Sequence, residues 1–193
     1  MGSPELGYIH KIDKQRQNPP SREDIGDWGK EAEETVIEFF RNNFPGVEIR
    51  RATPAEDSGK RESGGKAVDA VAYIDGKPSL GLQITTSTDS AVKDSKSQLM
   101  KDFPFLRLAE MRNTDPSIPR ALVFLKAGQV AEYVKNPDFK RHPEMAGQIL
   151  ESVIKSLQFA SLKTKDQDDH KRINVLLAMF QKELEQIKKG RLN

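Results

Sequence analysis

The chain of 193 residues contains no cysteine, so disulfides, thiolate metal sites and cysteine nucleophiles are all excluded. It has no apolar run near the roughly 20 residues that a membrane helix needs, and its start lacks the hydrophobic region of a signal peptide. Neither a GxGxxG sequence nor a Walker A sequence is present, which removes the two common glycine motifs that cradle phosphates. These absences favour a cytoplasmic protein with no membrane partner.

An excess of one charge is also missing. The chain carries 31 Lys and Arg against 29 Asp and Glu, whereas a generic nucleic-acid binder has a stronger basic excess. Any basic surface would therefore have to be local. Runs of mixed sign such as KTKDQDDHKR indicate solvated surface. The histidines His10, His142 and His170 are isolated and lack metal-ligand spacing, so we expect them at the surface.

Hydrophobic periodicity and turn residues predict an α/β fold. The expected elements, in chain order, are a helix over 27–43, a strand over 47–51, two hairpin strands over 67–74 and 80–86, a helix over 90–111 with a break at Pro104, a strand over 120–126, and helices over 144–159 and 173–188. Consecutive strands near the start favour a mixed central sheet with helices on its faces, because a Rossmann domain alternates strand and helix.

Three regions follow from this order. Residues 1–27 are expected to form a polar N-terminal arm, residues 28–126 an α/β core, and residues 127–193 a helical extension packed on that core. The apolar stripes of the last two helices are most simply packing surfaces against the core or each other. Homodimerisation through these stripes is the alternative.

Polar residues that can carry chemistry gather on the predicted hairpin and the first helix. Asp69 lies in the first hairpin strand, and Gln83 and Thr85 lie two residues apart on the second. Residues two apart in a strand point to the same face, so Gln83 and Thr85 project together, away from Leu82 and Ile84. On the helix, Glu33 is the acidic residue best placed to face a sheet, while Glu31 and Glu34 are expected to face water.

This ordered set resembles the PD-(D/E)XK nuclease superfamily, particularly its restriction-endonuclease-like and archaeal Holliday-junction-resolvase-like members. The family has a Gly-x-x-x-Glu helix start, then an arginine, a Ser-Gly loop, a strand Asp and, on the next strand, (E/Q)-x-K. Here GKEAE supplies Glu33, VDAVA supplies Asp69 and QIT supplies the last element. Candidates for the arginine and the loop are Arg50 or Arg51, and Ser58–Gly59 or Ser63–Gly65. The resemblance covers about residues 28–126 and implies a restriction-endonuclease-like mixed sheet flanked by helices, with additional C-terminal helices.

The resemblance also implies an activity, a Mg²⁺-dependent (or Mn²⁺-dependent) endonuclease-like hydrolysis of DNA. The metal ligands that it implies are oxygens of Asp69, Gln83 and Glu33 and the backbone carbonyl of Ile84. The metal would activate water and stabilise charge on the phosphate. Thr85 stands where the family has its lysine, which helps to position the nucleophile and to neutralise developing charge.

The threonine leaves two interpretations open. A lysine from elsewhere, such as Lys66 or Lys93, could replace the missing cation and preserve catalysis. Alternatively, the chain is a nuclease-fold protein that has lost catalysis and now binds nucleic acid or a protein partner, with Lys60, Arg61 and Lys66 as phosphate contacts. A third interpretation treats the C-terminal helices as an interaction module on an α/β scaffold.

Taken singly, each site residue also has an ordinary structural explanation. Asp69 suits a hairpin, Thr85 suits a strand, and Glu33 suits a helix N-terminus.

Overall fold

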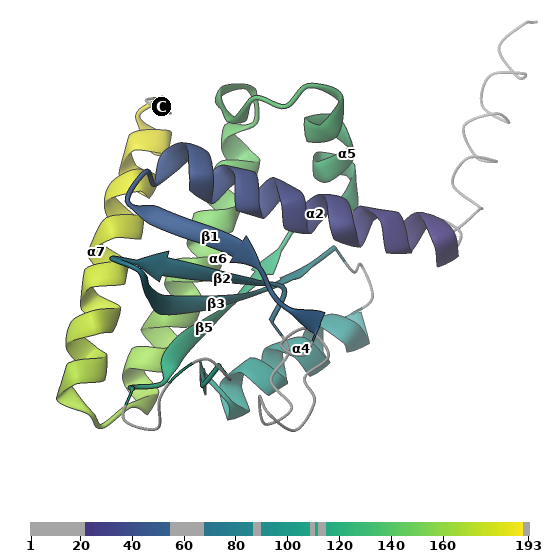
Figure 1. Cartoon of the computed structure of the whole chain (residues 1–193). Helices are drawn as coiled ribbons and strands as arrows, with labels where there is room; N and C mark the ends of the chain where they lie inside the picture. Colours follow the sequence, from purple (N-terminus) through teal and green to yellow (C-terminus); the bar gives the residue numbers. More distant parts are fainter. Residues whose placement is uncertain (1–21, 55–67, 87–89, 109–110, 112–114, 191–193) are drawn as a thin grey trace, which may run out of the picture.

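An α/β fold with a five-stranded mixed sheet and five α-helices emerges from a computed structural model that describes residues 22–54, 68–86, 90–108, 111 and 115–190 (Figure 1). In chain order the elements are α2 Arg22–Asn43, β1 Val47–Arg51, β2 Ala70–Ile74, β3 Lys77–Thr85, α4 Ser90–Asp102, β4 Phe105–Leu106, β5 Ile118–Phe124, α5 Ala127–Lys135, the 3-10 helix η2 Phe139–Arg141, α6 Pro143–Lys163 and α7 Gln167–Lys188. None of the helices within these residues is long and apolar enough to cross a membrane.

The sheet has the strand order β1-β2-β3-β5-β4, in which only β3 and β5 are parallel. The β2–β3 hairpin turns on Asp75 and Gly76, whose φ angles are 51° and 69°. An Asp-Gly pair suits this two-residue turn because both positions need positive φ. The parallel step from β3 to β5 requires a crossover, which contains α4.

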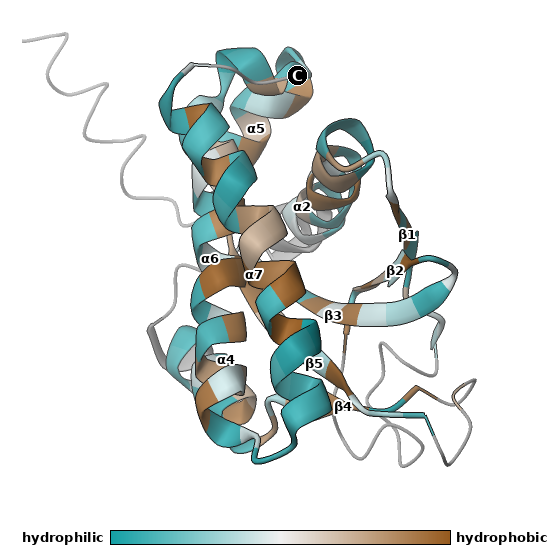
Figure 2. Cartoon of the chain, turned by 90° about the vertical axis from the view of Figure 1, so that its left-hand side faces the viewer, coloured by the Kyte–Doolittle hydropathy of each residue, from teal (hydrophilic) through white to brown (hydrophobic). Residues whose placement is uncertain are grey.

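The larger hydrophobic core lies on one face of the sheet, under α2, α5, α6 and α7. Leu80, Leu82 and Ile84 of β3 point into it, as the alternation of the strand predicted. Phe40 of α2 and Phe180 of α7 meet edge to face, with ring centroids 5.7 Å apart. Figure 2 shows hydrophobic residues along α6 and α7 where these helices face the rest of the fold. The strands and the C-terminal helices therefore share one core.

The opposite face of the sheet carries a smaller apolar cluster and the candidate site. The cluster consists of Val68, Val71, Leu106, Leu108 and Ile118. These side chains come from around β2, from β4 and the residues after it, and from the start of β5. Among the described residues, this cluster is smaller than the main core.

Helix α6 covers the outer edge of β5. The hydroxyl of Ser156 accepts a hydrogen bond from the Leu122 N–H at 3.1 Å, and the side-chain amide of Gln148 donates to the Phe124 carbonyl at 2.7 Å. Strand β4 pairs with β5 only at Ile118 and Pro119. The side chains of Ser156 and Gln148 therefore bind backbone groups of β5 that a further strand would otherwise pair with.

Several boundaries differ from the sequence-based expectation. The first helix begins at Arg22 rather than Asp27, so residues 22–27 are helical. The helix expected over 90–111 ends at Asp102, and a short strand follows Pro104, because proline disfavours helix at the residue before it. Helix α5 was not predicted as an element of its own, because its nine residues are too few to show a long helical periodicity.

We predict that Gly81→Ala destabilises the fold by about 1–3 kcal/mol, because a methyl group there overpacks the smaller apolar cluster. A Cβ at Gly81 would lie 2.6 Å from Cδ2 of Leu106 and 3.1 Å from Cγ1 of Val68. The control is Gly147→Ala inside α6, where the nearest atom is 4.0 Å away and alanine should stabilise the helix by about 0.5–1 kcal/mol. Urea unfolding measures both, and equal effects would contradict the close approach at Gly81.

Candidate functional site

Gln83 and Thr85 lie side by side on the face of β3 opposite the main core. Both side chains are buried, with 7% and 6% of each residue exposed. Their neighbours Leu82 and Ile84 belong to the main hydrophobic core. The alternation of β3 therefore places the amide and the hydroxyl on one face, as predicted.

Asp69 lies directly beside this part of β3. It precedes β2 by one residue, whereas the sequence had placed it within the strand. Its carboxylate accepts a hydrogen bond from the backbone N–H of Ile84 at 2.5 Å, and its own N–H donates to the Leu82 carbonyl at 2.7 Å. Its carbonyl accepts from the Ala52 N–H at 2.9 Å. Backbone and side chain thus hold the half-buried Asp69 between the ends of β1 and β3.

A buried arginine completes the cluster, and the sequence analysis missed its role. Arg120 of β5 is 1% exposed. Its guanidinium donates to the Gln83 amide oxygen at 3.3 Å and to the Phe103 carbonyl at 3.2 Å. Burial lowers the pKa of Arg120 to about 10, against the opposing effect of the Asp69 carboxylate, so the group stays charged at neutral pH. The available signal was the charged residue Arg120 at the start of the apolar run RALVFLK, which Lys126 ends.

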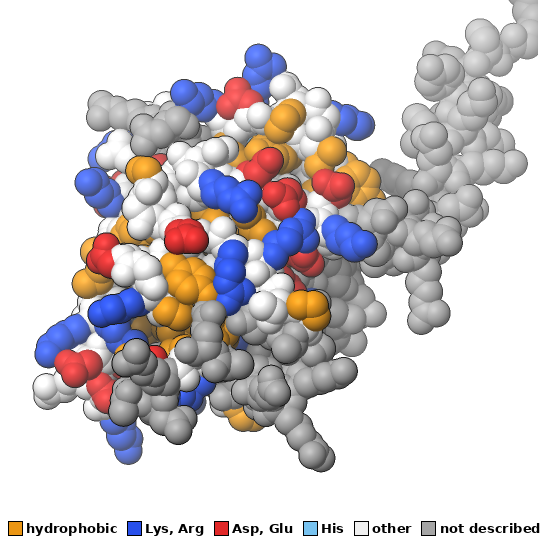
Figure 3. Space-filling view, in the orientation of Figure 1, with side chains coloured by type: hydrophobic (Ala, Val, Ile, Leu, Met, Phe, Trp, Pro, Cys, Tyr) orange, Lys and Arg blue, Asp and Glu red, His pale blue; other side chains and the backbone are white. Residues whose placement is uncertain are grey.

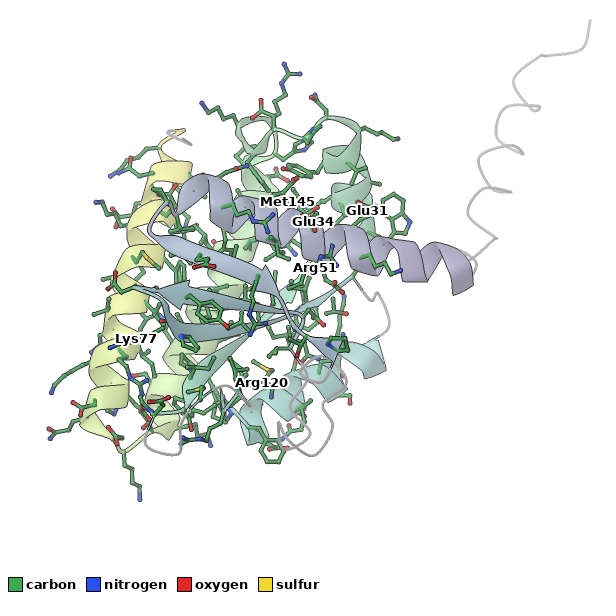
Figure 4. All side chains as sticks on the ribbon, viewed as in Figure 1. Glu31, Glu34, Arg51, Lys77, Arg120 and Met145 are labelled. Atoms are coloured by element: carbon green, nitrogen blue, oxygen red, sulfur yellow. The ribbon has the colours of Figure 1, made fainter. Side chains whose placement is uncertain are left out.

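Glu33 forms an ion pair with the end of β1. Its carboxylate lies 3.1 Å from the guanidinium of Arg51, and Glu34, which was expected to face water, lies 2.6 Å from the same group (Figure 4). The hydrogen bond to Glu34 raises the pKa of Arg51. Arg51 pairs with Ala70, a residue of the main core, so this acid–arginine group lies on the face of the sheet that α2 covers and not on the face of Gln83 and Thr85.

The other sequence candidates have different places. Arg50 points to the opposite side of β1, where its guanidinium lies over the ring of Tyr73 and donates to the tyrosine hydroxyl at 2.8 Å. Lys93 lies on α4. The expected Ser-Gly loop candidates and the cations proposed to bind phosphate fall outside the described residues, namely Ser58–Gly59, Ser63–Gly65, Lys60, Arg61 and Lys66.

The cluster offers the oxygen ligands that a divalent cation takes, although these ligands carry little negative charge. Within the described residues no three His, Cys, Asp or Glu side chains could hold a metal ion together. The carboxylate of Asp69 and the amide oxygen of Gln83 are the type of oxygen donor that a divalent cation takes. The Ile84 carbonyl leaves β3 on the side of Asp69, because the N–H and C=O of a strand residue face the same neighbour. Asp69 would be the main charged ligand, since Glu33 already pairs with Arg51.

We predict that Arg120→Met lowers the free energy of unfolding by about 1–3 kcal/mol, because it leaves buried acceptors without their donor. Those acceptors are the Gln83 amide oxygen and the Phe103 carbonyl. The matched control is Arg41→Met, which removes an exposed ion pair with Glu34 at 3.6 Å and should cost less than about 0.5 kcal/mol. Denaturant titrations compare the two, and similar small losses would argue against a structural role for Arg120.

Similarity to known proteins assigns neither a family nor an activity to this arrangement. Comparison of the chain with protein-family models, with curated proteins and with solved structures found no match. The geometry of Asp69, Gln83 and Arg120 therefore provides the main support for any function proposed for the chain.

Proposed function

We propose that the protein is a metal-dependent phosphodiesterase that acts on DNA, a variant of the PD-(D/E)XK nucleases that its motifs resemble. The contact between the Asp69 carboxylate and the Ile84 N–H carries this proposal. It joins the aspartate and the Gln-Ile-Thr segment, which are the two elements that the resemblance pairs. Asp69 and Ile84 are 15 residues apart in the chain, so the contact depends on the folded hairpin.

The proposed cofactor is Mg²⁺ or Mn²⁺, held by oxygens of Asp69 and Gln83 and by the Ile84 carbonyl. When bound, the cation would lower the pKa of a water molecule and stabilise charge on the phosphate. Affinity for such cations depends on the number of charged ligands. Because Asp69 is the main charged ligand, we expect weak binding, with a dissociation constant of about a millimolar.

Arg120 would supply the positive charge that Thr85 lacks. Its guanidinium hydrogen bonds to Gln83, and its charge interacts with that of Asp69. In a buried setting a fixed charge acts more strongly than it would in water. Arg120 would thus be a positioning residue that holds Gln83 and favours an anionic phosphate nearby, while the Thr85 hydroxyl can donate one hydrogen bond.

We predict Mg²⁺- or Mn²⁺-dependent cleavage of single-stranded, duplex or branched DNA that is abolished by chelation. Asp69→Asn should reduce the rate about a hundredfold or more, since it removes the main charged ligand. The control is Asp75→Asn in the hairpin turn, where φ is 51° and asparagine is tolerated. The measurement is a gel assay with labelled DNA. Absence of cleavage on all three substrates, or equal rates for the two variants, would refute the proposal.

A Thr85→Lys variant provides a second readout. Lysine at this position restores the family pattern, so cleavage should become faster if the site is a weakened nuclease centre. Thr85 is buried beside Phe124 in the register of β3 and β5, so circular dichroism must first establish that the variant folds. A folded variant with unchanged or lower cleavage would indicate that the position does not act as it does in the family.

A second candidate is a nuclease-fold protein that binds DNA without cutting it. The hydrogen bond from Arg120 to Gln83 favours this alternative, because it occupies one lone pair of an expected metal ligand. Figure 3 shows Lys and Arg interspersed with Asp and Glu on the face displayed there, so binding would depend on local cations. We predict DNA binding in the presence of EDTA that weakens with added salt. Salt-insensitive binding, or none, would contradict this candidate.

A further inference from the structure

A pocket of about 420 Å³ lies next to the candidate site, between α4 and α6. Leu122 and Phe124 of β5 form part of its floor. Met100 and Lys101 contribute from α4, and Phe159 contributes from α6. This volume lies within the range of about 300–1,000 Å³ that is usual for small-ligand sites.

The register of the sheet places this pocket one strand away from the site residues. Gln83 of β3 pairs with Leu122 of β5, and Thr85 pairs with Phe124. Neighbouring strands are about 4.8 Å apart, and paired residues of parallel strands share a face. Arg120 belongs to both places, because it lines the pocket and donates to Gln83. A ligand in the pocket would therefore lie against the same face as the proposed catalytic groups.

The charges that line this pocket are all positive. Lys101, Lys155 and Arg120 contribute them, and none of the described lining residues is acidic. A second hollow, of about 720 Å³ near the β2–β3 turn, lacks this bias, because Asp75 and Asp115 line it together with its cations. The pocket beside the site therefore favours an anion.

The remaining lining favours a flat apolar group on the same ligand. Phe124 and Phe159 offer aromatic rings, and Met100 offers a thioether. Stacking of a nucleobase on an aromatic side chain tolerates any base and contributes strongly to single-strand binding. Lysine ammonium groups bind phosphate through charge-assisted hydrogen bonds. A nucleotide combines the two chemical groups that this lining can recognise.

We propose that the pocket between α4 and α6 binds one nucleotide of a single-stranded nucleic acid, adjacent to the phosphate that the candidate site would hold. The base packs against the aromatic residues, and Lys101 and Lys155 contact the phosphate. If the protein is the proposed nuclease, its substrate would be a nucleic-acid strand with an unpaired base; this part of the inference rests on the proposed function. Binding itself requires neither the metal nor cleavage, so the two can be tested apart.

The test is fluorescence anisotropy of a short labelled oligothymidylate with the full chain in EDTA. Lys155→Glu is expected to weaken binding at least tenfold, and Phe159→Ala about tenfold, since stacking is lost. The matched control is Lys182→Glu on α7, an exposed lysine that does not line the pocket and whose variant should bind as the native protein does. Circular dichroism checks that each variant is folded.

Competition defines the ligand. Thymidine monophosphate should displace the oligonucleotide at lower concentration than thymidine or inorganic phosphate, because only the nucleotide has both groups. The same measurement with a labelled oligouridylate shows whether the pocket prefers DNA or RNA, and preference for either supports the proposal.

Some outcomes would overturn the inference. These are no binding by the native chain, equal binding by Lys155→Glu and Lys182→Glu, or displacement by phosphate as effective as by the nucleotide. Metal-dependent cleavage without such binding would contradict the nucleotide pocket but not the nuclease proposal. Binding without cleavage would support the pocket and contradict the nuclease proposal.

Discussion

The candidate site lies where β3 extends beyond the start of its antiparallel partner β2. Strand β2 begins at Ala70, so the N–H of Ile84 extends past the regular pairing of the hairpin. A buried N–H without an acceptor would cost about 1–3 kcal/mol. The Asp69 carboxylate accepts this bond, and in doing so it fixes a negative charge beside the backbone of β3, where it interacts with the charge of the buried Arg120. One structural requirement of the sheet thus places charged groups where chemistry can use them.

Arg120 shows how that arrangement is maintained. A buried guanidinium is costly unless its donors are satisfied, and its bonds link β5 to β3 and to the end of α4. The same links determine the position of Gln83. Stability and site geometry are therefore coupled, and a change at Arg120 acts on both.

Much of the fold follows from patterns within single segments. The alternation in β3 predicted which residues face the core, and the Asp75–Gly76 pair marked the hairpin turn. The closeness of Asp69 to the Gln-Ile-Thr segment also followed, because both belong to one hairpin. The contact between Arg120 and Gln83 did not, since it joins residues 37 apart across a parallel pairing that no local pattern reveals. Similarly, Glu34 has no sequence signal for its ion pair with Arg51.

The meeting of Phe40 with Phe180 has a consequence for the order of folding during synthesis. These rings belong to α2 and α7, so an early helix packs against one made about 140 residues later. Chains elongate at about 5–20 residues per second, which leaves the phenylalanines of α2 without this partner for roughly 7–28 s. During that interval the exposed aromatic face is available to chaperones or to other nascent chains. A core that joins the two ends of the fold can form completely only after α7 has left the ribosome.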